Sequence, residues 1–103
     1  MDREFYRNQL INQNNDLYAH IDKIENLSIR LCVTQITASI TRLCSLNEPD
    51  KIYLYLESIS TMFYIFECML KEMGIHEEGA NAHWKYEYRH LQYCIEYFEK
   101  YYL

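Results

Sequence analysis

Residues 50–73, DKIYLYLESISTMFYIFECMLKEM, decide the expected fold, because their apolar side chains recur at three- and four-residue spacing. This period predicts one face of a single long helix, made by Ile52, Leu56, Ile59, Phe63, Phe66, Leu70 and Met73. A second apolar row runs beside the first and contains Tyr55, Met62, Ile65 and Met69. Because a helix with two apolar faces has to be covered on both, we expect neighbouring helices or a second copy around it.

The composition of the chain is typical of one small all-α domain. Its 103 residues are 50% hydrophobic, which disfavours disorder, and they accommodate a single core. Only two Gly and one Pro interrupt the chain, so long helices are expected. We therefore predict an all-α fold over residues 1–103, a small helical bundle of three to four helices that self-associates through its apolar central and terminal helices.

The segment that precedes residues 50–73 is expected to be helical almost throughout. Residues 2–13 read as a short amphipathic helix, and INQNND at residues 11–16 favours a break because Asn and Asp prefer caps and turns. A near-heptad row passes through the same residues and favours continuity: Leu10, Leu17, Ile21, Ile24 and Leu31. Both alternatives stay open at this point. From residue 16 to residue 46 the helical period continues through Ile29, Val33, Ile36, Ile40 and Leu43.

A strip of small, uncharged side chains runs along the back of this second segment: Thr34, Thr37, Ala38, Thr41 and Ser45. Small side chains let a neighbouring helix approach closely, so we favour a helix–helix seam. The alternative is the wall of a polar pocket.

Three boundaries follow from turn residues. Pro49 suits the first turn of the central helix. Gly74 is expected to end that helix, with Ile75 folding back as the apolar residue of its cap. Asn81 is a candidate N-cap for a final helix over residues 82–101.

The final helix divides into three rows. The predicted core row contains Trp84, Tyr88, Leu91, Ile95, Phe98 and Tyr102. The predicted solvated row contains Lys85, Arg89, Gln92, Glu96 and Glu99. Between them lies an aromatic row, which we call the tyrosine row: Tyr86, His90, Tyr93, Tyr97 and Tyr101. Tyr is enriched at interfaces, so this row is the candidate partner-binding surface, with Tyr bodies packed along a crowded bundle as the alternative.

Charge and cysteine placement restrict the class of protein. The net charge of −5 argues against non-specific nucleic-acid binding, which needs clustered Lys and Arg. The four cysteines are scattered without a paired motif and are expected to be free thiols: Cys32, Cys44, Cys68 and Cys94. MDREFYRNQL at the start has no apolar segment typical of a signal peptide. Glu57 and Glu67 lie inside the longest apolar helix, where each would cost about 3 kcal/mol at the centre of a bilayer. We expect a cytoplasmic protein with no membrane contact.

One spacing in the final helix is compatible with metal binding. His83, Glu87 and His90 lie at i, i+4 and i+7, which can align three ligands on one helix face. A ligand from a second helix would also be needed, and His20 and His76 read as isolated. Solvated helix residues are therefore the favoured interpretation, and no metal or cofactor is expected.

Two segments carry a resemblance to a known family. They are RLCVTQITASITRL (residues 30–43) and YLYLESISTMFYIFECM (residues 53–69). The order of the helices over residues 27–98, with a small polar face followed by Glu near the start of the next helix, resembles the MazG-like all-α nucleotide pyrophosphohydrolases. In that family ExxE and ExxD pairs hold Mg²⁺ on a nucleoside triphosphate. The matching positions here are Gln35, Ala38, Glu57 and Ser60, so one acid of four remains, and the resemblance implies a nucleotide pocket without hydrolysis.

These observations favour a non-enzymatic protein-interaction module, of the kind encoded by phages or mobile elements as an inhibitor or regulator. Its expected partner is another protein, bound through the tyrosine row, or a second copy of the chain. The alternative is a MazG-like nucleoside triphosphate pyrophosphohydrolase or a sensor that binds a nucleotide near Gln35 and Glu57.

Overall fold

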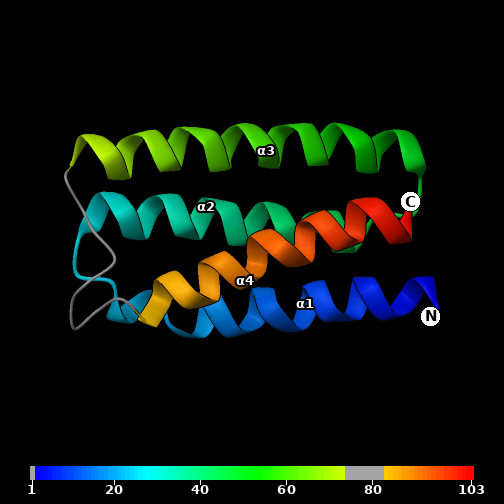
Figure 1. Cartoon of the computed structure of the whole chain (residues 1–103), viewed down its shortest axis with the longest axis horizontal. Helices are drawn as coiled ribbons and strands as arrows, with labels where there is room; N and C mark the ends of the chain where they lie inside the picture. Colours follow the sequence, from blue (N-terminus) through cyan, green and yellow to red (C-terminus); the bar gives the residue numbers. More distant parts are fainter. Residues whose placement is uncertain (1, 74–82) are drawn as a thin grey trace.

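The computed structural model describes residues 2–73 and 83–103, and this part of the chain forms an antiparallel bundle of four α-helices (Figure 1). The helices are α1 (Arg3–Ala19), α2 (Leu27–Cys44), α3 (Pro49–Glu72) and α4 (His83–Tyr97). A 3₁₀ turn, η1 (Ile21–Lys23), follows α1, and a π-helical turn, η2 (Phe98–Tyr102), continues α4. No strand occurs within the described ranges. The predicted all-α bundle is confirmed.

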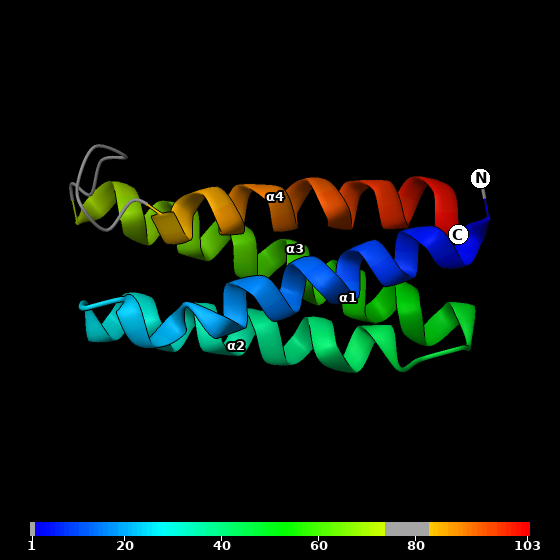
Figure 2. The same cartoon turned by 90° about the horizontal axis from the view of Figure 1, so that it is seen from below.

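The helices run alternately up and down, so that the two chain ends lie at the same end of the bundle (Figures 1 and 2). α1 packs along both α2 and α4, and α3 packs along α2. Arg3 and Arg7 hold the two chain ends together, because both guanidinium groups lie over the ring of Tyr102, 4.6 and 4.7 Å from its centroid. Arg3 Nε also donates to the Tyr102 carbonyl oxygen at 2.8 Å.

The N-terminal helix passes through residues 11–16 without a break, so the continuous alternative is the correct one. Asn14 is buried, and its amide donates to the Thr37 carbonyl oxygen (3.1 Å) and to Thr41 Oγ1 (3.0 Å) on α2. A polar residue that looked like a cap instead forms hydrogen bonds from α1 to α2, at Thr37 and Thr41 of the predicted seam. Only Thr37 of that strip is buried, whereas Thr34, Ala38, Thr41 and Ser45 are exposed, so the seam covers only part of the strip. The unbroken helical segment expected over residues 16–46 is wrong. The chain turns after Ala19, and Asn26 starts α2 by accepting a hydrogen bond from the Ile29 backbone N–H (3.1 Å).

α3 begins at Pro49 as predicted, and five residues of its first apolar row are buried: Ile52, Leu56, Ile59, Phe66 and Leu70. Phe63 is half-buried and Met73 is 40% exposed at the end of the helix. In the second row Tyr55, Met62 and Met69 are half-buried and Ile65 is exposed. α3 is therefore an outer helix with one well-covered face. The expected cap at Gly74 and Ile75 and the expected N-cap at Asn81 lie outside the described residues.

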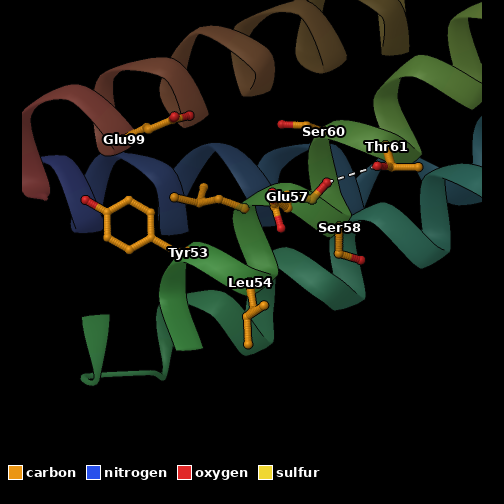
Figure 3. A pocket seen from close by; sticks show the side chains of 8 residues that line it. Tyr53, Leu54, Glu57, Ser58, Ser60, Thr61 and Glu99 are labelled. Atoms are coloured by element: carbon orange, nitrogen blue, oxygen red, sulfur yellow. Dashed lines mark hydrogen bonds between the residues drawn. The ribbon is translucent and has the colours of Figure 1, made fainter. Parts of the chain in front are cut away.

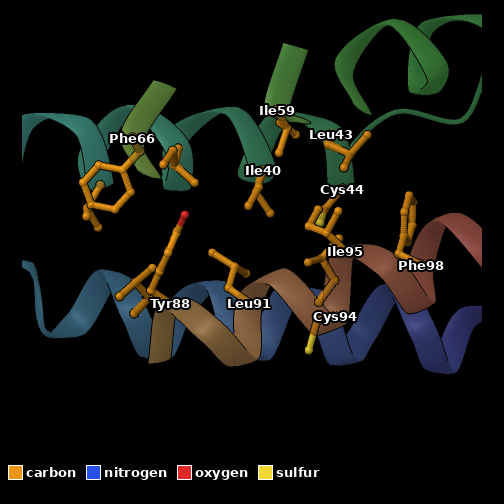
Figure 4. Close-up of a cluster of buried hydrophobic side chains, with 14 of the residues drawn as sticks. Ile40, Leu43, Cys44, Ile59, Phe66, Tyr88, Leu91, Cys94, Ile95 and Phe98 are labelled. Atoms are coloured by element: carbon orange, nitrogen blue, oxygen red, sulfur yellow. The ribbon is translucent and has the colours of Figure 1, made fainter. Parts of the chain in front are cut away.

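The core is filled by side chains from all four helices, and Figure 4 shows Tyr88, Leu91 and Ile95 of α4 pointing toward residues of α2 and α3. All six residues of the predicted α4 core row are buried. The prediction that Lys85 belongs to the solvated row is wrong, because this residue is only 8% exposed. Its ammonium lies 5.9 Å from the centroid of the Trp84 ring, an arrangement in which the aliphatic stem of Lys is buried and the charge contacts an aromatic face.

Candidate functional site

The tyrosine row lies on the outward face of α4 and η2. Tyr86, Tyr93, Tyr97 and Tyr101 are between 45% and 71% exposed, and His90 is exposed beside them. The row is therefore the most outward of the three rows on this helix, whereas the sequence placed it between the core and the solvated row. Large aromatic rings at this level of exposure have no core to fill, and they remain available for contact with another molecule.

The aromatic surface continues from η2 onto α1. The ring of Tyr101 stacks on Tyr6 with 4.9 Å between centroids, and Phe5 meets Tyr6 edge-on at 5.2 Å. Tyr97 lies 6.2 Å from Tyr101 on the same surface. Sequence reasoning missed this extension because Phe5 and Tyr6 belong to the other end of the chain. The apolar residues of α1 gave the signal, but nothing in the sequence placed them against η2.

A groove borders the tyrosine row on the side of α3, and we call it the α3–α4 groove. It consists of two adjoining pockets of about 710 and 360 Å³, which share Ser60 and Glu99. Figure 3 shows Glu99 on the opposite side of the larger pocket from Glu57, Ser60 and Tyr53 of α3. The smaller pocket includes Tyr93, so the groove and the tyrosine row form one surface. Polar and aromatic side chains that line the groove include Tyr53, Glu57, Ser60, Gln92, Tyr93, Glu96 and Glu99.

The row that was predicted to be solvated borders this groove. Glu96 and Glu99 are exposed, Gln92 is half-buried, and Arg89 is exposed but reaches toward α3. Arg89 Nη1 lies 3.2 Å from Glu67 Oε1, so its positive charge is offset by a carboxylate. Three further carboxylates line the groove, from Glu57, Glu96 and Glu99. The groove is consequently acidic along an aromatic edge.

The four positions of the expected nucleotide pocket are divided between two places. Glu57 and Ser60 both line the larger pocket of the α3–α4 groove. Gln35 and Ala38 are exposed on α2 and are not among the residues that line this pocket. The carboxylate that joins Glu57 is Glu99 of η2, which the family pattern did not indicate.

A cluster of titratable side chains lies at the junction of α1 and α4. His83 and Glu87, two of the three residues aligned by the sequence, meet His20, and one ligand atom from each lies within 4.8 Å of the others. His90 is exposed and is not part of this group. His20 was expected to be isolated, but it lies beside His83 and Glu87. It follows the last turn of α1, where the antiparallel packing brings it beside the start of α4.

Comparison with protein-family models, with curated proteins and with solved structures gives no match for this chain. The resemblance to the MazG-like family therefore stays a prediction. Among the described helices, none has both the length and the apolar composition that crossing a bilayer requires.

Proposed function

We propose that this chain is a non-enzymatic protein-interaction module that binds a basic segment of a partner protein. The segment occupies the α3–α4 groove and contacts the tyrosine row, and the module acts in the cytoplasm as an inhibitor or regulator of its partner. The observation that carries the proposal is the combination of carboxylates and exposed tyrosines on one surface, with Tyr93 belonging to both parts.

The chemistry of this surface favours Lys and Arg side chains in the partner. Glu57, Glu96 and Glu99 supply negative charge along the groove, and the tyrosine rings supply faces for cation–π contacts. Tyr combines a large contact area with a polar tip, which is why it is enriched in protein interfaces. Complementary charge also speeds association, so binding should weaken as salt concentration rises.

Charge also favours a different protein over a second copy of this chain as the occupant of the groove. The chain carries a net charge of −5, and a second copy would bring its own carboxylates against the same acidic groove. Like charges across an interface oppose association. We therefore place a basic segment, rather than a second copy, in the groove, and self-association becomes an outcome of the test.

The test measures binding of labelled peptides by fluorescence anisotropy. A Lys/Arg-rich peptide is compared with an Asp/Glu-rich peptide of equal length at two salt concentrations. The variant Tyr93→Ala/Tyr97→Ala should weaken binding of the basic peptide roughly 30-fold or more, since truncating a central interface aromatic often costs about 2 kcal/mol of binding free energy. Glu96→Gln/Glu99→Gln should also weaken binding of the basic peptide and make that binding less dependent on salt concentration. The matched control is Tyr18→Ala, which removes a Tyr that is 65% exposed on α1.

Equal binding of the two peptides, or unchanged binding by both double variants, would contradict the proposal. A sizing column gives a second readout. If the chain forms dimers that Tyr93→Ala/Tyr97→Ala disrupts while its melting curve is unchanged, the surface is occupied by a second copy and the proposal is wrong.

A nucleotide sensor or pyrophosphohydrolase is the second candidate, because Glu57 and Ser60 line one pocket and Glu99 adds a second carboxylate there. Nucleoside triphosphates with Mg²⁺ provide the test. Saturable binding of a nucleotide that Glu57→Gln removes would favour this candidate over the interaction module.

A further inference from the structure

We propose that His20, His83 and Glu87 form a binding site for one transition-metal cation of the Zn²⁺, Co²⁺ or Ni²⁺ class. The three residues come from two helix ends that lie side by side at one end of the bundle (Figures 1 and 2). His20 directly follows α1, and His83 and Glu87 occupy successive turns at the start of α4. This site is independent of the α3–α4 groove and of the proposed function.

The distances are close to those of a metal centre. One ligand atom from each of the three side chains lies within 4.8 Å of the others, and Glu87 Oε1 is 3.8 Å from His83 Nε2. The ring centroids of His20 and His83 are 5.1 Å apart. In a tetrahedral zinc site, bonds of about 2.0–2.1 Å place the ligand atoms about 3.3–3.4 Å apart. Binding would require the three side chains to turn toward the ion and close the remaining distance.

Neighbouring groups already orient two of the three ligands. Gln13 Nε2 donates to Glu87 Oε2 at 2.9 Å and to the Glu87 carbonyl oxygen at 3.1 Å, which leaves Oε1 directed toward the histidines. His20 Nδ1 lies 2.8 Å from the Asp16 carbonyl oxygen. Because a carbonyl only accepts, Nδ1 donates its proton there, so Nε2 is the His20 atom available to a metal. Outer hydrogen bonds of this kind, to a ligating carboxylate and to a ligating His, are a regular part of metal sites.

The ligand types select the class of cation. Imidazole nitrogens with one carboxylate suit Zn²⁺, Co²⁺ and Ni²⁺, whereas Mg²⁺ and Ca²⁺ prefer oxygen ligands alone. The side chains of His20 and Glu87 are 25% and 19% exposed and that of His83 is 70% exposed, so an ion can enter from solvent. Three protein ligands leave a fourth position for water or for a group from another molecule. A bound ion would tie the end of α1 to the start of α4.

The experiment uses the full chain after treatment with a chelator and desalting. Zn²⁺ binding is measured by calorimetry, Co²⁺ binding by visible absorption, and the melting temperature is recorded with and without Zn²⁺. We expect one ion per chain, a Co²⁺ spectrum with nitrogen and oxygen ligands, and a higher melting temperature with Zn²⁺. His20→Ala, His83→Ala and Glu87→Gln should each abolish these effects. His90→Ala, which removes an exposed His outside the cluster on the same helix, should keep them.

Gln13→Ala distinguishes a built site from histidines that happen to lie at the surface. Loss of an outer hydrogen-bonding partner should weaken Zn²⁺ binding about 10- to 100-fold. The proposal is overturned if the unmodified chain binds no Zn²⁺ saturably, or if His20→Ala and Glu87→Gln bind it with unchanged affinity. A Co²⁺ spectrum with thiolate charge-transfer bands would also overturn it, because the cysteines would then hold the metal.

Discussion

The hydroxyl of Tyr88 on α4 donates a hydrogen bond to the carboxylate of Glu67 on α3, with 3.0 Å between Oη and Oε1. Gln92 Nε2 donates to the same hydroxyl at 3.2 Å. The Tyr88 ring meets Phe66 edge-on, with 5.1 Å between the centroids. Bulky rings and this polar contact thus bridge α3 and α4, whose backbones are further apart than those of the other neighbouring helices. Burial and then the negative charge of Glu67 raise the pKa of Tyr88 well above its usual range.

The stability of the fold should fall at alkaline pH. Burial also raises the pKa of the Cys44 thiol from 9.0 to about 11, so Cys44, like Tyr88, holds its proton more tightly in the folded chain. Above pH 9 the unfolded chain binds fewer protons than the folded one, and the free energy of unfolding must then decrease as pH rises. Urea titrations at a series of pH values from 7 upward measure this. Stability that stays constant through pH 11 would contradict it.

Tyr88→Phe separates the two contributions to the alkaline effect. The variant should lose about 1.5–3 kcal/mol at neutral pH, since the hydrogen bond to the charged Glu67 and the one from Gln92 both disappear while the ring remains packed. It should also show a smaller decrease of stability at alkaline pH than the unmodified chain. Tyr93→Phe is the matched control, because Tyr93 lies on the same helix and is 57% exposed.

The contact of Asn14 with α2 makes a second stability prediction. Asn14→Ala should lower the free energy of unfolding by about 1–3 kcal/mol, because it removes two hydrogen bonds and leaves a void between the helices. Asn14→Leu should cost less. It fills the space and removes the buried Asn14 Oδ1, an atom with no hydrogen-bond partner among the described residues. Chemical denaturation of the three proteins gives the comparison, and a larger loss for Leu than for Ala would show that the polar contact itself determines the packing.

The helical rows of α2, α3 and α4 could be predicted because burial on one helix face repeats in the sequence with the period of the helix. The turn at residues 20–26 could not. Asn14 and Asn26 are the same residue type and have the same propensity for caps and turns. Asn14 bridges two helices because Thr37 lies beside it on α2, whereas Asn26 caps the start of α2.

The candidate sites were predictable to different degrees for a related reason. The tyrosine row lies along one helix, so its spacing shows it directly. The α3–α4 groove and the meeting of His20 with Glu87 depend on which helices pack together, and a single sequence carries no signal for that choice. Glu57 and Glu99 line the same pocket, and no sequence motif links the two residues.

The four cysteines should be free thiols in the purified protein, as they are in the structure. Cys44 and Cys94 are buried, and burial raises the pKa of both thiols, so little reactive thiolate forms at neutral pH. Intact mass measured with and without reductant should be identical, and a brief reaction with iodoacetamide should label Cys32 and Cys68 before the other two. A loss of two daltons without reductant would indicate a disulfide.

Hydrolysis of nucleoside triphosphates should be undetectable. In the MazG-like family four carboxylates hold Mg²⁺ on the triphosphate, and three of the four matching positions carry Gln35, Ala38 and Ser60 instead, which supply no charged oxygen ligand. Gln35 and Ala38 also lie away from the pocket that contains Glu57, so a compensating change beside them would not complete a metal site there. The remaining acid in that pocket is Glu99.

The assay measures pyrophosphate and phosphate release from a panel of nucleoside triphosphates with Mg²⁺ and with Mn²⁺. Glu57→Gln and Glu99→Gln serve as site variants, and Glu25→Gln, at an exposed position outside the groove, serves as the control. Turnover that disappears in the two site variants and persists in the control would make the chain an enzyme with a rearranged carboxylate pair.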